Sequence, residues 1–200
     1  MDEHNVVETD DTNVSTELDT QETGPSKATK FKEEVISWAK AIAVAAVVAF
    51  IVNNFIIVNA MVPTGSMETT IMTDDRIVAF RLSYLFSEPE RFDIVVFENP
   101  ADRDVLFIKR IIGMPGETVL IANGGVYING ERLYSDEQFI KEPFGGNAGP
   151  FVVGAGEYFV LGDNRNNSDD SRAWLNPFVP AENILGRAIF QYFPRISLLH

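Results

Sequence analysis

The 200-residue chain is 46% hydrophobic, enough for one hydrophobic core, and its net charge of −13 argues against a nucleic-acid partner because few cations are available to neutralise phosphates. It contains no cysteine, which excludes disulfides, thiol catalysis and cysteine-based zinc sites. The two histidines, His4 and His200, lie at the chain ends, so we expect no Ser-His-Asp triad, no metal and no cofactor. Any acid–base catalyst must then be a lysine, aspartate, glutamate or tyrosine.

The first 30 residues form an acidic segment. Residues 1–30 hold eight acidic side chains and two lysines, a net charge of −6, with many threonine, asparagine, serine and glycine residues. Such a composition cannot bury a core and predicts a disordered tail. A tail that binds a partner is the alternative to one that is only solvated.

Residues 35–58, "VISWAKAIAVAAVVAFIVNNFIIV", predict one transmembrane helix of about the length that spans ~30 Å of hydrocarbon. The alternative is a cleaved signal peptide, but the acidic segment before it is the wrong kind of n-region. Basic residues cluster on its N-terminal side: Lys27, Lys30, Lys32 and Lys40. The positive-inside rule then predicts a single-pass cell-membrane protein with a cytoplasmic N-terminus and everything after Ala60 extracytoplasmic.

Residues 61–195 read as a mainly β, antiparallel domain. Short apolar runs, each bounded by turn signals, predict strands at "RIVAF", "FDIVVF", "VLFIKRIIG", "ETVLIA", "GVYING", "EYFVLGD" and "RAIFQYF". Asn129-Gly130 suits a type I′ hairpin turn. The glycine-rich stretch 123–152 predicts a small insertion or flap, and one helical turn is expected over 180–184.

Two polar residues suggest chemistry when they are taken together. Strand alternation over 105–112 places Lys109 between apolar side chains on one face and Arg110 on the other. Burial lowers a lysine pKa and makes it a candidate general base; the alternative is an amine that reaches water while its stem packs. Ser66, in a "PTGS" turn where serine is ordinarily structural, would complete a nucleophile–base pair with Lys109. The Thr64 hydroxyl and the Ser66 backbone N–H could then form an oxyanion hole.

The acid-rich stretch "GDNRNNSDDSR", residues 162–172, follows a predicted strand. It fails the EF-hand pattern, because positions 3, 6 and 12 counted from its first aspartate are Arg, Ser and Trp. A buried guanidinium needs an acidic partner, so we expect ion pairs, with the pairing left open, among Arg110, Arg172, Asp163 and Asp170. Ser168 could hold the lysine amine by a hydrogen bond. The alternative is a solvated loop.

Four segments, in this order, resemble bacterial type I signal peptidases, which are membrane-anchored Ser-Lys proteases: "PTGSMETTI", "RFDIVVFENP", "FIKRIIGMPGETV" and "LGDNRNNSDDSR". The single anchor and short insertion are similar to the compact Gram-positive form. The resemblance implies that Ser66 is the nucleophile, Lys109 the general base and Thr64 the oxyanion side chain. It implies that Ser168 orients Lys109, and that a supporting ion-pair network consists of Asp163, Asp170, Arg110 and Arg172.

The resemblance also implies the substrate. The end of a signal peptide would lie extended beside residue 62 and residues 106–108, with cleavage after an Ala-x-Ala site. Small pockets are expected from Val62, Met67, Ile71, Phe107 and Ile108. The sequence departs from the family pattern at Thr69 (usually proline), Phe92 (often glycine) and Asn166 (often aspartate). The first two bear on loop geometry, and the third removes one charge pair.

Other functions stay open from the sequence. One is a non-catalytic, membrane-anchored assembly chaperone of the same fold, whose members lack the catalytic serine or lysine. Another is a self-cleaving Ser-Lys peptidase of the repressor type, which would need a DNA-binding domain that this acidic chain gives no sign of. A plain anchored β domain would not explain the polar clusters. Expected partners are signal peptides of secretory preproteins, the lipid bilayer and the protein-export machinery, with the enzyme a monomer.

Overall fold

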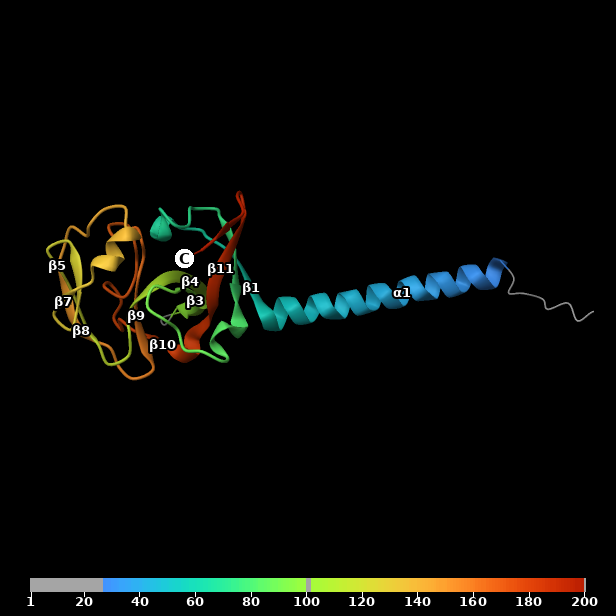
Figure 1. The fold of residues 1–200 in the computed structure, drawn as a ribbon, viewed down its shortest axis with the longest axis horizontal. Helices are drawn as coiled ribbons and strands as arrows, with labels where there is room; N and C mark the ends of the chain where they lie inside the picture. The colour runs from blue at the N-terminus through green and yellow to red at the C-terminus, as the bar shows by residue number, and fades with distance from the viewer. Residues whose placement is uncertain (1–26, 100–101, 200) are drawn as a thin grey trace, which may run out of the picture. The chain divides into compact units, whose positions relative to one another are not determined.

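The computed structural model describes residues 27–99 and 102–199 (Figure 1). These residues divide into two compact units. The first is helical and ends at Ala45, and the second, here named the β unit, begins at Ala46. Residues 1–26 of the predicted tail lie outside the described residues. Residues 27–30, which were predicted as part of the tail, instead form the first turn of helix α1 (Lys27–Ile51).

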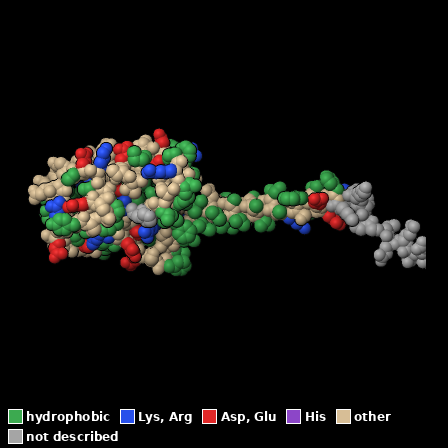
Figure 2. Space-filling view, turned by 45° about the horizontal axis from the view of Figure 1, so that its top comes forward, with side chains coloured by type: hydrophobic (Ala, Val, Ile, Leu, Met, Phe, Trp, Pro, Cys, Tyr) green, Lys and Arg blue, Asp and Glu red, His purple; other side chains and the backbone are tan. Residues whose placement is uncertain are grey.

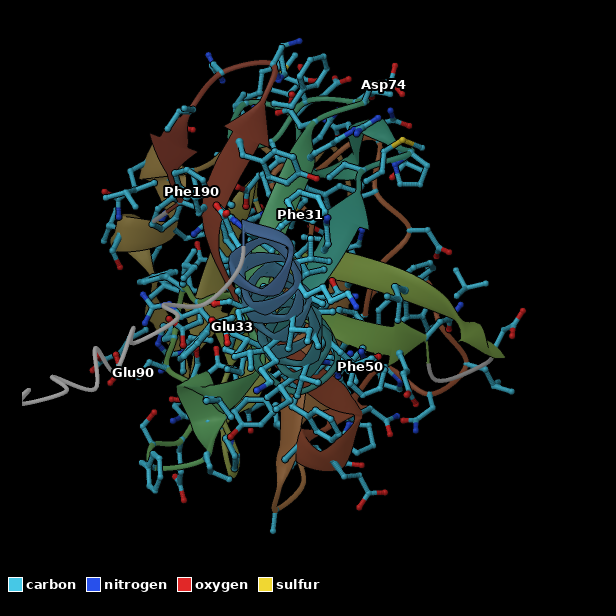
Figure 3. All side chains as sticks on the ribbon, turned by 90° about the vertical axis from the view of Figure 1, so that its right-hand side faces the viewer. Phe31, Glu33, Phe50, Asp74, Glu90 and Phe190 are labelled. Carbon is cyan, nitrogen blue, oxygen red and sulfur yellow. The ribbon has the colours of Figure 1, made fainter. Side chains whose placement is uncertain are left out.

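The apolar segment forms a helix of membrane-spanning length. Helix α1 continues into a π-helical turn, Val52–Ile56, and the stretch Phe31–Ile56 is long and apolar enough to cross a membrane. Hydrophobic side chains predominate along the visible face of α1, and charged ones lie toward its N-terminal end (Figure 2). Phe31 and Phe50, labelled in Figure 3, are 68% and 63% exposed. Asn54 is accommodated because its side chain donates to the Phe50 carbonyl oxygen at 2.8 Å.

The predicted span of 35–58 ends two residues too late. Ile57 and Val58 belong to strand β1 (Ile57–Met61), which pairs with strand β2 (Arg76–Phe80) through Ile57↔Phe80 and Val58↔Ala79. Both residues are β-branched and suit a pleated strand as well as a helix. The periodicity of a short apolar run cannot separate these states, and only the partner strand does.

The β unit holds two antiparallel sheets (Figure 1). In spatial order the main path of the larger sheet is β1, β2, β11 (Ile184–Phe193), β3 (Ile94–Asn99), β4 (Asp102–Gly113), β9 (Glu157–Leu161) and β10 (Val179–Pro180), with β12 (Ser197–Leu198) beside β11. The smaller sheet has the order β7 (Glu131–Arg132), β6 (Gly125–Ile128), β5 (Thr118–Ala122) and β8 (Ala148–Val152). The mainly β, antiparallel prediction is confirmed.

The smaller sheet contains the predicted insertion but begins earlier, at Thr118 rather than at residue 123. Strand β5 was predicted, but its partners are β6 and β8 and not a strand of the larger sheet. The hairpin turn has φ of 50° at Asn129 and 89° at Gly130, as a type I′ turn requires. The helical turn expected near residue 180 is the 3₁₀ turn Ala181–Asn183.

Two departures from the family pattern have positive φ. Thr69 has φ of 96°, which proline, with φ fixed near −65°, cannot adopt. Phe92 has φ of 75°, a conformation that suits glycine and is strained for a bulky side chain. Both contact the same aromatic residue, because the Thr69 hydroxyl donates to the Phe139 carbonyl oxygen at 3.0 Å and the Phe92 ring lies 5.1 Å from the Phe139 ring.

Candidate active site

Ser66 and Lys109 come together although 43 residues separate them in sequence. Ser66 lies in the 3₁₀ turn Gly65–Met67, and Lys109 lies in strand β4. The Lys109 amine donates to Ser66 Oγ at 2.6 Å, and the two residues are only 4% and 7% exposed, respectively. A hydroxyl and an amine at this distance, shielded from water, have the geometry of a nucleophile and its base.

The turn that carries Ser66 is anchored from both sides. Met67 is fully buried in the core cluster below the turn, and the Ile71 N–H donates to its carbonyl oxygen at 2.8 Å. Val62 exchanges backbone hydrogen bonds with the next turn, accepting from the Asp74 N–H at 2.8 Å and donating to the Asp75 carbonyl oxygen at 3.0 Å. Asp74 is labelled in Figure 3. The serine is therefore held on a fixed backbone and not on a free loop.

Burial changes the protonation of Lys109. Its pKa falls from 10.5 to about 8, because desolvation by burial outweighs the nearby carboxylates Asp170, Asp169 and Asp163, which raise it. Arg172 lowers the pKa slightly further. A neutral amine is thus accessible at mildly alkaline pH, which is what a general base requires.

Thr64 lies beside the same hydroxyl. Its Oγ1 donates to Ser66 Oγ at 3.4 Å, a long hydrogen bond in a partly buried position. A hydroxyl on this side of Ser66 could turn toward an oxygen bound there. The oxyanion role of Thr64 stays a prediction, to which the structure adds this placement.

The loop of residues 162–172, here named the active-site loop, bonds directly to the Ser66 turn. The Asn164 N–H donates to the Ser66 carbonyl oxygen at 3.0 Å, and the Asn164 side chain donates to the Gly65 carbonyl oxygen at 3.0 Å. Close approach requires glycine at position 162, where an added Cβ would lie 2.4 Å from the Ser66 carbonyl oxygen. Sequence reasoning missed Asn164, although its place between two charged residues of the motif was a signal.

The structure settles which acid pairs with which base. Asp163 accepts from Arg110 Nε at 2.9 Å and Nη2 at 2.8 Å, and neither side chain is exposed. Asp170 accepts from Arg172 Nε and Nη2, both at 2.7 Å, and from the Gly162 N–H at 3.0 Å. These fork-shaped pairs give each buried guanidinium, which cannot lose its proton, a carboxylate partner, although Arg172 Nη1 is buried with no hydrogen-bond partner among the described residues. They fix the loop at both ends.

Ser168 does not make the expected hydrogen bond to Lys109. Its Oγ is buried and has no hydrogen-bond partner among the residues that the structure describes. It does lie on the wall of the same cavity as Lys109 and Ser66. Ser168 is therefore close to Lys109, as its predicted orienting role requires, but it does not donate a hydrogen bond to the Lys109 amine or accept one from it.

A cavity of about 640 Å³ opens over the pair. Its wall consists of residues 60–67, 105–109 and 166–169 and Ala173. Of the predicted pocket residues, four lie on this wall: Val62, Met67, Phe107 and Ile108. Ile71 does not, because its side chain is fully buried in the core cluster under the Ser66 turn. Prediction missed the polar wall formed by Asn166, Asn167 and Asp169.

The described residues contain no group of three His, Cys, Asp or Glu side chains that could hold a metal ion. The chemistry that this arrangement offers comes from a buried hydroxyl on Ser66 and a buried amine on Lys109, with the Thr64 hydroxyl beside them. The apolar wall of residues 105–108 and the polar wall of residues 166–169 face the same space.

Comparisons place the chain among known proteins. The family described as "Signal peptidase, peptidase S26" matches residues 35–193. A probable signal peptidase I-2 from Synechocystis sp. is 40% identical over 192 residues, covering 92% of this chain and 86% of the relative. The signal peptidase I of Leptolyngbya laminosa is 40% identical over 163 residues, covering 78% of each. A crystal structure of a signal peptidase I from Enterococcus faecalis is 36% identical, covers 50% of this chain and 97% of that one, and has a TM-score of 0.42.

Proposed function

The chain belongs to the signal peptidase family, peptidase S26, and we propose that it cleaves signal peptides from exported preproteins with Ser66 as the nucleophile and Lys109 as the general base. The observation that carries this proposal is the 2.6 Å contact between the two buried side chains on the wall of one cavity. A non-catalytic chaperone of the same fold would have no use for this contact.

In the proposed reaction, neutral Lys109 accepts the Ser66 hydroxyl proton while Ser66 Oγ attacks the scissile carbonyl carbon. The Thr64 hydroxyl and the Ser66 N–H donate to the oxyanion that forms. Lys109 then gives its proton to the leaving amine, which becomes the new N-terminus, and the signal peptide remains as an ester on Ser66. A water molecule, deprotonated by Lys109, hydrolyses the ester, and the proton returns to Ser66 Oγ.

The open edge of strand β4 supports binding of an extended substrate. Strand β4 pairs with β9 only from Arg110 onward, so residues 105–109 extend past the end of that partner. A signal-peptide segment can add there as a strand, and its alternate side chains then face the same wall. Met67 and Ile108 leave little depth for the side chains that point at them, since both are buried. Small residues at alternate positions, as in Ala-x-Ala, fit this arrangement.

The proposed location is a membrane surface. The stretch Phe31–Ile56 would anchor the chain, and the lysines before and within it favour a cytoplasmic N-terminus. Ser66 follows Ile56 by ten residues, a reach of at most roughly 35 Å for extended chain. We therefore propose an extracytoplasmic β unit that meets its substrate where the signal peptide leaves the bilayer.

The test is cleavage of a preprotein with an Ala-x-Ala site by the full chain in lipid vesicles from pH 5 to 10. Wild type should release a fragment that ends at this site, and its kcat/KM should rise through about pH 8 as Lys109 loses its proton. Ser66→Ala and Lys109→Ala should each lose at least about 10³-fold in kcat. The exposed Ser87 and Lys141 provide matched controls, as Ser87→Ala and Lys141→Ala.

Each result decides a part of the proposal. Near-native cleavage by Ser66→Ala or Lys109→Ala would show that the pair is not the catalytic one. Absence of cleavage by folded wild type as well would favour the chaperone of the same fold. Loss in the two catalytic variants alone, with both controls active, would support the pair.

A further inference from the structure

The smaller sheet reaches the active-site loop through a buried ion pair. The 3₁₀ helix Tyr134–Gln138 follows β7, and β8 begins at Ala148. Residues 134–147, which include this helix and lead to β8, are here named the inserted segment. Arg165 of the active-site loop donates from Nη1 to Asp136 Oδ2 at 2.6 Å and from Nη2 to Oδ1. Both side chains are 3% exposed. Arg165 Nε also donates to the Gly162 carbonyl oxygen at 3.1 Å, so the guanidinium holds the loop's own curvature.

The next residue of the loop is held by the same segment. Asn166 accepts from the Gly145 N–H at 3.0 Å and donates to the Pro143 carbonyl oxygen at 3.0 Å. The Arg172 guanidinium lies 4.3 Å from the Phe144 ring centre. The inserted segment thus contacts the active-site loop at three positions. Of these contacts, the ion pair is the one whose loss would leave a buried charge without a partner.

A short path runs from this ion pair to the nucleophile. Arg165 directly follows Asn164, whose N–H donates to the Ser66 carbonyl oxygen at 3.0 Å. A guanidinium cannot deprotonate, so without its carboxylate Arg165 would have to turn toward water. That movement would displace the adjoining peptide group and weaken the hydrogen bond between the Asn164 N–H and the Ser66 carbonyl oxygen. A displacement of about 1 Å at a catalytic group can cost about 100-fold in rate.

We propose that Asp136 and Arg165 are a positioning pair that keeps Ser66 within hydrogen-bond distance of Lys109. This inference rests on the proposed function of Ser66 and Lys109. Asp136 and Arg165 are not part of the cavity wall, and they act through Asn164. Their loss should therefore lower kcat and leave KM nearly unchanged. The smaller sheet then takes part in catalysis, because it supplies the carboxylate that fixes the active-site loop.

The experiment compares Asp136→Asn with Glu137→Gln in the full chain. Glu137 is the adjacent residue of the same 3₁₀ helix, and its ion pair with Arg132 is exposed, with side chains 46% and 32% accessible. At temperatures where both variants are folded, Asp136→Asn should lower kcat by about 10- to 100-fold with KM within about twofold. Glu137→Gln should keep the wild-type values. Equal kcat for the two variants would overturn the proposal.

Hydrogen exchange gives a second measurement that does not depend on cleavage. The Asn164 amide should exchange about 10-fold faster in Asp136→Asn than in Glu137→Gln, because its bond to Ser66 is weakened. Arg165→Gln should reproduce the effect, and the double variant should lose no more kcat than either single change, as members of one unit do. Unchanged Asn164 exchange would overturn the positioning link even if wild type is active. Inactive wild type would instead refute the proposed function, and the exchange comparison would still decide the link.

Discussion

Replacing Lys109 by methionine tests whether burial sets the protonation of this lysine. Desolvation lowers its pKa from 10.5 to about 8, whereas in the unfolded chain the amine is solvated and keeps its ordinary value. Between pH 8 and 10.5 the unfolded state therefore binds more protons than the native state. By linkage, the stability of wild type rises with pH across this window relative to a variant without the amine.

The magnitude follows from the two pKa values. A fall from 10.5 to about 8 corresponds to a cost of about 3 kcal/mol for folding with a protonated Lys109 near neutral pH. At pH 9.5 most native molecules carry the neutral amine, and about 2 kcal/mol of that cost has disappeared. Lys109→Met has no such cost at any pH. From pH 7 to 9.5, the unfolding free energy of wild type should therefore rise by about 2 kcal/mol relative to that of Lys109→Met.

Urea unfolding of the full chain in detergent measures this difference. Trp174 provides a fluorescence signal from the β unit, because its ring lies 6.0 Å from Phe97 and 5.7 Å from Phe107. Lys109→Met removes this one amine and keeps every other side chain of the protein, so the comparison isolates the contribution of Lys109. Lys141→Met, which removes an exposed lysine, is the matched control for the loss of a lysine as such. Parallel pH curves for wild type and Lys109→Met would refute the reasoning that burial shifts this pKa.

Three further predictions concern the loops around the site. Gly162→Ala should lower kcat severely, since its Cβ would lie 2.4 Å from the Ser66 carbonyl oxygen; native kcat would show that this approach is not needed. Asp163→Ala should cost about 3–5 kcal/mol in urea unfolding because it leaves Arg110 charged and buried, and a loss below 1 kcal/mol would contradict this. Phe92→Gly should be about 1 kcal/mol more stable than Phe92→Ala, because φ of 75° suits glycine; equal unfolding midpoints would argue against strain there.

The predictions that succeeded rest on local patterns. Alternation in "VLFIKRIIG" correctly placed Lys109 and Arg110 in a buried strand, and the Asn-Gly pair correctly marked the hairpin turn. The boundary of the apolar helix was wrong by two residues, because Ile57 and Val58 suit either state and their strand partner lies more than twenty residues away. Ile71 was predicted to line the substrate pocket, but its side chain is fully buried in the core cluster.

The sequence by itself determined the long apolar helix, most strands of the β unit and the kind of chemistry available, because strand period, apolar length and the lack of cysteine and central histidine are properties of the chain alone. Only the tertiary structure decided the pairings. Arg110 meets Asp163 across 53 residues, and Arg165 meets Asp136 across 29. Such contacts depend on how strands and loops that are distant in the sequence pack against one another, and no local period encodes that packing. The same packing sets the depth of the cavity and the burial that shifts the pKa of Lys109.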